Sequence, residues 1–443
     1  MTANIPLTIL VLIGVGAPAL LFALLGIAAF VDRSPSEAVT GRLTALAMAL
    51  SCATLFSALV SLLAGSGMRF LTYGGWSHAG GIAVQFLVDR LSLAFAALSA
   101  AILGIVAAFS HRYLHREPGF HRYFVLLAMF ATGMELIALA GNVEVLFIGW
   151  ELVGLSSALL IAFFHERPAP LVNGLRVFSV YRISDAALLS AAVMLQLRAG
   201  DDGLAMLFSG GPAHAHLGGA AATAIAVLLI VAVAGKSALI PFSGWLPRAM
   251  DGPTPSSAVY YGALSVHAGC FLLLRAMPLL AHAPAARILA GVLGAATAAF
   301  AAATTRVQSD VKSSLAYASL TQVGLIVVEI ALGWQLLAFL HIAGHMCLRL
   351  LQLLSAPNVL HDLHGLSGNA TRRRPWLSRM LPERYGRRIY LFALERGFLD
   401  SLLDQAVVHP LLNAARRLSR VDARLCGAVL AASTPPADGG EDE

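Results

Sequence analysis

Charged and titratable side chains occur inside long apolar stretches of this sequence, where they are costly. The clearest example is Lys236, which follows an apolar run that begins at Gly219. A lysine near the middle of a bilayer costs about 3 kcal/mol on insertion scales, so such residues are usually functional. Pro241 lies five residues further on, and we expect it to break the helix and leave the carbonyl of Ser237 without its usual donor. A charged side chain beside a broken helix is typical of ion sites in transporters.

Other apolar stretches carry further acids, bases and histidines. Such groups on successive membrane helices, connected by water, could pass a proton from one to the next. For Arg182 and Asp185 a structural ion pair is an equal alternative, and the histidines could simply form hydrogen bonds between helices. A metal site at His341 and His345 is disfavoured, because no third ligand is evident. The predicted proton-relay residues are Glu151, Arg182, Asp185, Lys236, His267, Lys312, His341, His345 and Arg349.

Three ionisable residues stay outside this prediction. Arg275 and Glu329 fall near the ends of apolar stretches and are expected at the membrane interface, and Glu135 has no assigned role. Only two of the 30 basic residues are lysines, Lys236 and Lys312. Arginine keeps its proton in proteins, whereas a buried lysine can lose it. An arginine-rich genome would explain the scarcity of lysine, but not why both lysines lie at or near the membrane.

Motifs of several enzyme classes are absent from the sequence. It has no Walker loop, no GxSxG motif, no dinucleotide fingerprint and no CxxC spacing. The cysteines are scattered, which predicts neither a zinc site nor a disulfide framework. We therefore expect no catalytic motif, metal or cofactor in this chain, and an ion gradient or a partner as its source of energy. The four cysteines are Cys52, Cys270, Cys347 and Cys426.

The composition is that of a multi-pass membrane protein. The 443 residues are 58% hydrophobic and 12% charged, with a mean hydropathy of +0.77. The net charge of +6 lies in loops and the tail, as the positive-inside rule expects, so nucleic-acid binding is disfavoured. We predict an all-α protein of the cell inner membrane, with the N-terminus outside and the C-terminus cytoplasmic. The eleven expected spans are at about 5–31, 42–64, 89–110, 122–140, 143–164, 171–197, 219–241, 255–280, 284–303, 311–332 and 335–356.

Segments outside the spans have their own patterns. Residues 68–88 predict an external hairpin, and a second external segment begins at Asp201 and Asp202. Leucine and phenylalanine at helical spacing in 389–410 predict one amphipathic helix for the membrane surface or a partner. The last residues, from Ser433, are expected to be disordered.

The segments around the predicted relay resemble a known family. They are GNVEVLFIGWELVGLSSALLIAF, RVFSVYRISDA, GKSALIPFSGWLPRAMDGPTPSSA and SDVKSSLAYASLTQVGLIV. They resemble the antiporter-like subunits of respiratory NADH–quinone oxidoreductase, especially chain 5 or the L-type subunit, and those of Mrp cation/proton antiporters. The resemblance covers about residues 85–356 and implies inverted five-helix repeats, each with a broken helix.

The resemblance also implies roles for individual residues. Glu151 matches the family's helix-5 glutamate and Lys236 its helix-7 lysine, a pair thought to exchange protonation. The remaining matches are Arg182 and Asp185 to the helix-6 charged pair, His267 to the helix-8 histidine and Lys312 to the helix-10 lysine.

Two departures from the family pattern stand out. Arg349 occupies a position where the respiratory subunit has lysine, and arginine cannot relay a proton as lysine could. The apolar pattern stops near Ala356, so we expect an incomplete second repeat. The expected regions are 1–110, N-terminal helices with the hairpin; 111–280, a first antiporter-like repeat with the broken helix; 281–356, a partial second repeat; 357–432, a cytoplasmic amphipathic tail; and 433–443, disordered.

The C-terminal part resembles a particular branch of the family. HMCLRLLQLLSAPNVLHD and ERGFLDSLLDQAVVHP look like the membrane subunit of the DAB-type inorganic carbon transporter. In that family a proton- or cation-conducting membrane subunit works with a large zinc-containing, carbonic-anhydrase-like partner. The resemblance implies energy-coupled accumulation of inorganic carbon as bicarbonate, with the zinc in the partner subunit.

Three functions follow as alternatives. The first is the ion-conducting subunit of an inorganic carbon transporter, and the second is a proton-translocating subunit of a respiratory or hydrogenase-type complex or a cation/proton antiporter. The third is a passive membrane anchor, for which Lys236→Ala would leave function intact. Both protons and sodium remain possible as the coupling ion.

Overall fold

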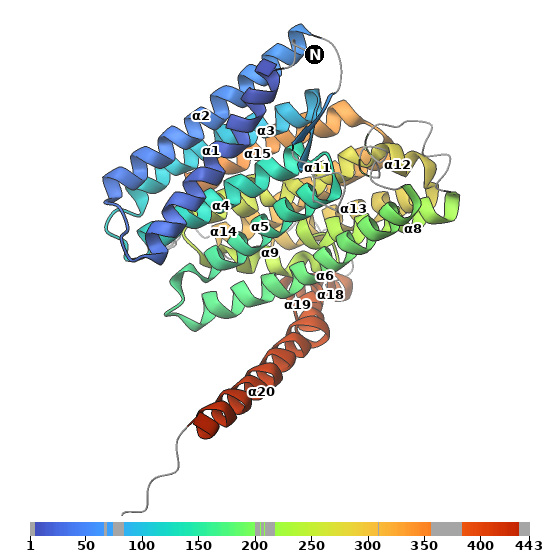
Figure 1. Cartoon of the computed structure of the whole chain (residues 1–443). Helices are drawn as coiled ribbons and strands as arrows, with labels where there is room; N and C mark the ends of the chain where they lie inside the picture. The colour runs from blue at the N-terminus through green and yellow to red at the C-terminus, as the bar shows by residue number, and fades with distance from the viewer. Residues whose placement is uncertain are drawn as a thin grey trace, which may run out of the picture.

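The computed structural model describes residues 5–65, 69–73, 84–199, 204, 208, 218–308, 310–355 and 383–433. These residues form a bundle of long helices with one small hairpin, in which α1 and α2 lie side by side at one edge (Figure 1). Eleven helices in the described part are long and apolar enough to cross a membrane. This confirms the predicted fold, an all-α multi-pass membrane protein. The spans are α1 (Ile5–Phe30), α2 (Glu37–Ala64), α3 (Arg90–Tyr113), α4 (Phe120–Leu139), α5 (Val143–Ile161), α6 (Pro168–Ala199), α8 (Gly219–Lys236), the composite span Thr254–Arg275, α13 (Pro284–Thr305), α14 (Val311–Leu332) and α15 (Gln335–Leu354).

Side-chain caps define where several spans begin. The Asn142 side chain accepts from the backbone N–H of Val145 at the start of α5. The Asp310 carboxylate accepts from Ser313 N–H at 2.7 Å at the start of α14. Each cap satisfies a backbone donor that has no partner within the helix. These caps set the starting points of the two helices that carry Glu151 and Lys312.

The predicted hairpin is present in its two arms. Strands β1 (Arg69–Tyr73) and β2 (Val84–Val88) pair antiparallel, with Arg69 opposite Val88. The turn residues 74–83 lie outside the described residues. Phe86 of β2 also forms a bridge with Ala140, which ties the hairpin to the connection between α4 and α5.

The α4 and α5 helices approach each other closely through small residues. A Cβ atom placed on Gly149 would lie 2.8 Å from the carbonyl oxygen of Gly133, which is less than a real Cβ contact allows. Small residues permit such close backbone contact between membrane helices. Gly149 comes two residues before Glu151, so this contact fixes the position of Glu151 along α5 relative to α4.

The helix break begins earlier than predicted. We expected Pro241 to end the seventh span, but α8 (Gly219–Lys236) ends at the lysine itself. Ala238 adopts the left-handed conformation, with φ of 56°, and the N–H of Leu239 donates to the carbonyl of Ala234 at 2.9 Å. This is a Schellman arrangement, which ends helices and usually places glycine at the left-handed position. The prediction from proline was therefore wrong in position, because the alanine turn stops the helix first.

The backbone groups released at the break are satisfied by side chains. The Trp245 indole N–H donates to the carbonyl of Gly235 at 3.0 Å. The N–H of Ile240 donates to the Thr297 hydroxyl at 3.1 Å. The chain continues through η5 (Phe242–Gly244), α9 (Trp245–Arg248) and η6 (Ala249–Asp251). Irregular backbone at membrane depth requires such partners.

The composite span lies at the centre of the bundle and is wholly buried. It consists of α10 (Thr254–Ser256), a π-helical segment η7 (Ser257–Ala263) and α11 (Ser265–Arg275), and α12 (Met277–His282) follows. In the π segment the N–H of Leu264 donates to the carbonyl of Val259. Such π segments are rare and occur often at functional sites. Apolar periodicity alone predicts an ordinary helix here.

The C-terminal part forms a bent strap rather than the single amphipathic helix predicted for 389–410. It comprises α18 (Glu383–Leu394), η8 (Arg396–Phe398), α19 (Leu399–Leu403), η9 (Asp404–Val408) and α20 (His409–Ser433). The prediction was wrong because all three residues of η8 adopt positive φ, between 53° and 69°, which ends α18. We call Arg396–Val408 the tail strap. Residues 356–382 and 434–443, which include the arginine run and the expected disordered end, lie outside the described residues.

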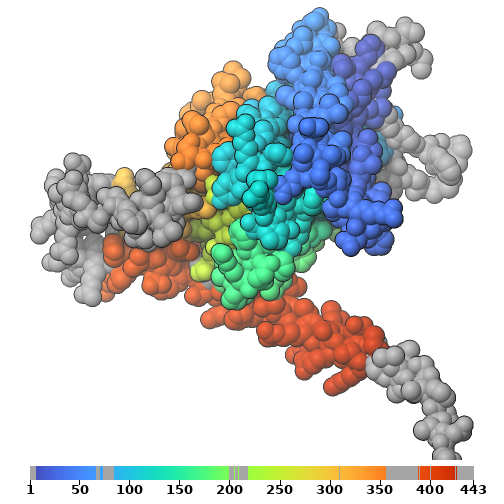
Figure 2. All heavy atoms as spheres, turned by 90° about the vertical axis from the view of Figure 1, so that its left-hand side faces the viewer, coloured from blue at the N-terminus to red at the C-terminus, as the bar shows by residue number. Residues whose placement is uncertain are grey.

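The tail strap is bound to the membrane bundle. Arg176 of α6 donates to both carboxylate oxygens of Asp404, at 2.7 and 2.5 Å. Leu403 and Val408 are buried, and α19 packs against η5, the turn that follows the break. Figure 2 shows these segments along one side of the bundle, with α20 extending beyond it.

Candidate functional site

Lys236 ends α8 with a side chain that is completely buried. Its ammonium donates to the backbone carbonyl of Trp150 at 2.9 Å. It also lies 4.8 Å from the centre of the Trp150 ring and 4.6 Å from that of Tyr181. Contact with aromatic faces stabilises a cation by about 2 kcal/mol where water is excluded. Among the described residues, no carboxylate forms a hydrogen bond or an ion pair with this ammonium.

Three further charged residues form a chain beside the lysine. Arg182 lies 2.8 Å from Glu151 and 2.8 Å from Asp185, so one guanidinium is shared by two carboxylates. Lys236 interacts electrostatically with all three residues. The structure thus brings together the predicted Glu151, Arg182, Asp185 and Lys236, but Glu151 does not touch the lysine directly. The predicted exchange pair is connected through the Trp150 peptide, which immediately precedes Glu151.

The helices fix this cluster in simple ways. Arg182 and Asp185 are three residues apart on α6 and so share one face. The Ser184 hydroxyl donates to the carbonyl of Ala232 at 2.6 Å, which binds α6 to α8 one turn before the lysine. Asp185 is almost fully buried, whereas the side chains of Glu151 and Arg182 are 28% and 35% exposed. The Glu151 end is consequently the more accessible end of the cluster.

A second cluster contains three of the predicted residues. Nε2 of His267 lies 2.8 Å from Nδ1 of His345. Nε of Arg349 donates to Nε2 of His345 at 3.0 Å, and its terminal N–H donates to Gln352 at 2.7 Å. The helical spacing predicted for His345 and Arg349 is observed, and the composite span supplies His267 from the opposite side.

His341 is one turn away on α15 and has different partners. Its Nδ1 lies 2.8 Å from Glu329 and its Nε2 lies 3.0 Å from the amide oxygen of Gln322. We expected Glu329 at the membrane interface, without a role, and the structure instead pairs it with His341. A signal was present in the sequence. Gly333 turns the chain in the left-handed conformation, with φ of 89°, and α14 and α15 form a hairpin in which residues on either side of the turn meet.

Lys312 belongs to a third group. Its ammonium donates to the Thr254 hydroxyl at 3.3 Å, and it interacts electrostatically with Asp251 and Asp310. Asp251 in turn accepts from Asn173 at 2.6 Å. The structure therefore places Lys312 at the end of a span, apart from both clusters described above.

A hydrogen bond from a side chain to the backbone connects residues next to the first two clusters. The Ser237 hydroxyl donates to the carbonyl of Val266 at 2.6 Å. Ser237 follows Lys236, and Val266 precedes His267. This hydrogen bond therefore joins the residue that follows the end of α8 to the helix that carries His267.

Two residues without a predicted role have clear surroundings. Arg275 is buried at the end of α11, pairs with Asp89 and lies 4.8 Å from the Phe208 ring centre. Glu135 is 1% exposed, and neither carboxylate oxygen has a hydrogen-bond partner among the described residues. Arg275 is structural on this geometry.

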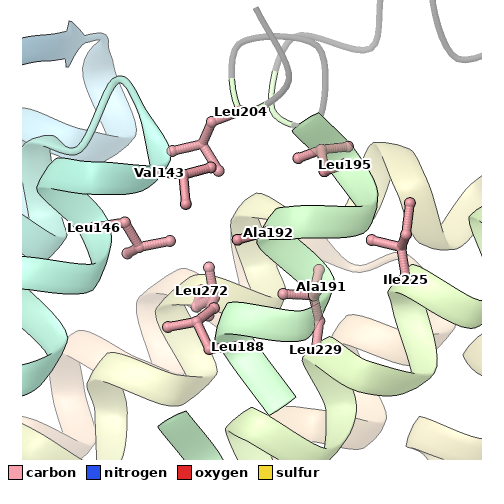
Figure 3. Close-up of a pocket in the computed structure, with 10 residues that line it drawn as sticks. All are labelled: Val143, Leu146, Leu188, Ala191, Ala192, Leu195, Leu204, Ile225, Leu229 and Leu272. Atoms are coloured by element: carbon pink, nitrogen blue, oxygen red, sulfur yellow. The ribbon is translucent and has the colours of Figure 1, made fainter. Parts of the chain in front are cut away.

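An apolar cavity lies next to the lysine cluster. It is lined by residues of α5, α6, α8 and α11, and Figure 3 shows that only carbon side chains face it. Leu188, in its wall, comes one turn after Asp185 on α6. Such a lining offers no ligand for an ion. Among the described residues, no three histidine, cysteine, aspartate or glutamate side chains group as metal ligands.

Comparison with protein families gives matches along most of the chain. Residues 140–380 match the family model described as NADH:quinone oxidoreductase/Mrp antiporter, transmembrane region. Residues 76–124 match the N-terminal model of chain 5 of NADH-ubiquinone oxidoreductase (complex I). The first match contains all nine predicted relay residues.

Individual relatives cover much of this chain. NADH-quinone oxidoreductase subunit L of Mycobacterium tuberculosis is 33% identical over 293 residues, which are 65% of this chain and 46% of the relative. NADH-ubiquinone oxidoreductase chain 5 of Schizophyllum commune is 31% identical over 373 residues, 83% of this chain and 54% of the relative. The chain spans about half the length of the curated relatives it matches.

Solved structures share the fold. A chain in the Mrp complex from Dietzia sp. superposes with a TM-score of 0.64 at 28% identity, over 78% of this chain and 37% of that one. A chain in the membrane-bound sulfane sulfur reductase, an archaeal respiratory membrane complex, superposes with a TM-score of 0.66 at 18% identity, over 78% of this chain and 70% of that one. With a family match over more than half of its residues, this chain belongs to the NADH:quinone oxidoreductase/Mrp antiporter family of membrane proteins.

Proposed function

We propose that this chain is a proton-translocating membrane subunit of a complex of the NADH–quinone oxidoreductase or Mrp antiporter type. The observation that carries the proposal is the environment of Lys236. Its buried ammonium contacts a backbone carbonyl and two aromatic rings, and no carboxylate in the described part of the chain is bound to it directly. A lysine without a fixed counter-ion can lose its proton when the nearby charges change.

The charges nearby are arranged to change together. In the observed state Arg182 is shared between Glu151 and Asp185. A proton that reaches Glu151 cancels its charge and leaves Arg182 to Asp185 alone. The field at Lys236 then becomes more positive, which favours loss of the lysine proton. In this proposal, protonation of Glu151 and deprotonation of Lys236 are therefore coupled steps.

Proton flux into liposomes tests this proposal. The chain is purified with the subunits that accompany it, reconstituted, and assayed with a pH-sensitive dye inside the vesicles. Lys236→Arg keeps the positive charge but removes the releasable proton, and Lys236→Met removes both. We expect both variants, and Glu151→Gln, to lower the flux by about 10²-fold, the low end of what loss of a proton-transfer group costs.

A matched control is Arg287→Lys, which changes a basic residue on α13 whose guanidinium bonds to the Ala331 carbonyl, away from the lysine cluster. It should assemble and translocate like the wild type. Wild-type flux in assembled Lys236→Met would overturn the proposal and support the passive anchor. A sodium-sensitive dye in the same vesicles separates sodium coupling from proton coupling.

Inorganic carbon transport is a narrower candidate. Its support is the resemblance of the segments that begin at His345 and Glu395, and the arginine at position 349. The relatives described above are redox-complex and antiporter subunits, which support the broader proposal better. Purification through an affinity tag discriminates the two, because a zinc-containing, carbonic-anhydrase-like partner is expected for the carbon transporter and respiratory subunits for the alternative.

A further inference from the structure

Arg349 meets His345 through a nitrogen that can only donate. The Nε–H of Arg349 lies 3.0 Å from Nε2 of His345, and arginine has no acceptor and keeps its proton in proteins. Nε2 of His345 must therefore be the acceptor and carry no hydrogen. Arg349 is itself anchored by the Gln352 amide oxygen at 2.7 Å, so the donor is held in this direction.

This contact determines the hydrogen positions in both histidines. A neutral imidazole without hydrogen on Nε2 carries it on Nδ1. Nδ1 of His345 then donates to Nε2 of His267 across 2.8 Å. His267 in turn carries its own hydrogen on Nδ1, which makes no hydrogen bond of ordinary geometry with the described residues. His267 also interacts with the backbone of Ala263, one turn earlier in the composite span.

We infer that Arg349 locks His345 and His267 as neutral, Nδ1-protonated imidazoles and so closes this histidine pair to proton passage. A proton moving along the pair from His345 to His267 would leave Nδ1 of His345 bare. Among the described residues, Arg349 is the group that contacts the other nitrogen, Nε2, and arginine does not release a proton to resupply it. In the opposite direction, Nδ1 of His267 already carries hydrogen and cannot accept another. The pair therefore ends a hydrogen-bonded chain.

The neighbouring histidine shows the opposite arrangement. His341 has the Glu329 carboxylate at one nitrogen and the Gln322 amide oxygen at the other. Both partners can accept, so His341 can hold a proton on each nitrogen. The charged and titratable groups that interact with His345 are His267, His341 and Arg349. Two histidines one turn apart on α15 thus have partners of opposite kinds: a donor contacts His345, whereas both partners of His341 can accept.

The assignment of the Nδ1-protonated tautomers is independent of the proposed function. The conclusion that the pair does not pass protons rests on that function. Nitrogen NMR of histidine-labelled protein in liposomes tests the lock directly, since protonated and bare imidazole nitrogens give separate signals. The signals of His345 are identified by their loss in His345→Gln. We expect one tautomer in the wild type, with hydrogen on Nδ1 and none on Nε2.

Removal of the Arg349 donor should allow His345 to adopt its other tautomer. In Arg349→Met we expect the Nε2-protonated form of His345 to appear, and in the matched control Arg287→Met the single wild-type tautomer should remain. Hydrogen on Nε2 of His345 in the wild type would overturn the inference, even if Arg349→Met fails to fold. An unchanged tautomer in folded Arg349→Met would also overturn it.

Proton flux tests the consequence. Glutamine at position 345 can donate to His267 through its amide nitrogen and accept from Arg349 through its oxygen, but it cannot carry a proton. We expect His345→Gln to retain flux within about twofold of the wild type, whereas loss of a transferring group costs about 10²-fold. A flux loss of that size in His345→Gln, with assembly intact, would show that the pair conducts and overturn the inference. Retained flux in Lys236→Met would instead contradict the proposed function and leave the NMR result standing.

Discussion

The ammonium of Lys236 is bonded to the carbonyl of Trp150, the residue that immediately precedes Glu151. The two residues expected to exchange protonation are therefore one peptide unit apart, and Arg182 contacts Glu151 and Asp185 beside them. This arrangement differs from a direct ion pair, which would hold the lysine proton in place. In the proposed mechanism, Arg182, which lies 2.8 Å from both Glu151 and Asp185, links a change of charge at Glu151 to Lys236.

Removal of Arg182 tests that relationship. In Arg182→Gln the Asp185 carboxylate loses its partner, and Lys236 becomes the nearest cation with which it interacts. We expect proton flux to fall by about tenfold or more, because an ion pair in a buried site holds the lysine proton. The double variant Arg182→Gln, Asp185→Asn should recover part of the loss, since the trapping carboxylate is gone. Additive losses in the two single variants and the double variant would contradict this view.

The close contact of α4 with α5 predicts that a larger residue at Gly149 lowers the stability of the protein. Gly149→Ala places a methyl group 2.8 Å from the Gly133 carbonyl, and the helices must separate to accept it. We expect a loss of about 1–3 kcal/mol, the usual range for overpacking, measured as a lower melting temperature in detergent. Gly16→Ala on α1 is the control, because a Cβ there meets nothing within 4 Å. Equal melting temperatures of the two variants would exclude a tight contact between α4 and α5.

The tail strap should loosen when its ion pair is removed. Asp404→Asn leaves Arg176, a nearly buried arginine, without a charged partner at that position. A hydrogen bond between charged groups contributes about 1.5–3 kcal/mol, so we expect faster hydrogen exchange in Arg396–Val408. Asp422→Asn on the exposed α20 is the matched control. Unchanged exchange in the strap of Asp404→Asn would mean that apolar packing of Leu403 and Val408 holds it without the ion pair.

Labelling of a cysteine tests the membrane orientation of the C-terminus that the loop charges predict. Cys426 is exposed on α20, beyond the strap. If the C-terminus is cytoplasmic, a membrane-impermeant maleimide should label Cys426 in inside-out vesicles and not in intact spheroplasts. Cys426→Ala removes the expected signal and serves as the control. Labelling in intact spheroplasts would reverse the predicted orientation.

The lengths of the apolar runs were sufficient to predict all eleven spans. In a membrane the backbone polar groups must be bonded within a helix, and the side chains of that helix must be largely apolar. The identities of the site residues could also be predicted, since a buried charge such as Lys236 is costly enough to be conspicuous. Their pairing could not. Whether Glu151 bonds to Lys236 or to Arg182 depends on side-chain directions across three helices, which spacing along one helix does not determine.

Two further misses have local causes. The break was predicted at proline, the strongest helix breaker in the segment, yet the chain turns earlier at Ala238, a residue type with high helix propensity. Tertiary contacts of the break, such as the Trp245 indole on Gly235, override that propensity. Glu329 was set aside because it lies near a helix end, although the tight turn at Gly333 brings that end against His341.

The tail strap connects the exposed helix α20 to η5, the turn that follows the end of α8. Leu403 is buried at the end of α19, which packs on η5, and α20 begins at His409 directly after η9. A protein bound to α20 that displaces the strap would therefore alter the packing around the end of α8. Thermodynamic linkage then requires the reverse effect: the protonation state of the lysine cluster would change the affinity of α20 for that protein by the same factor.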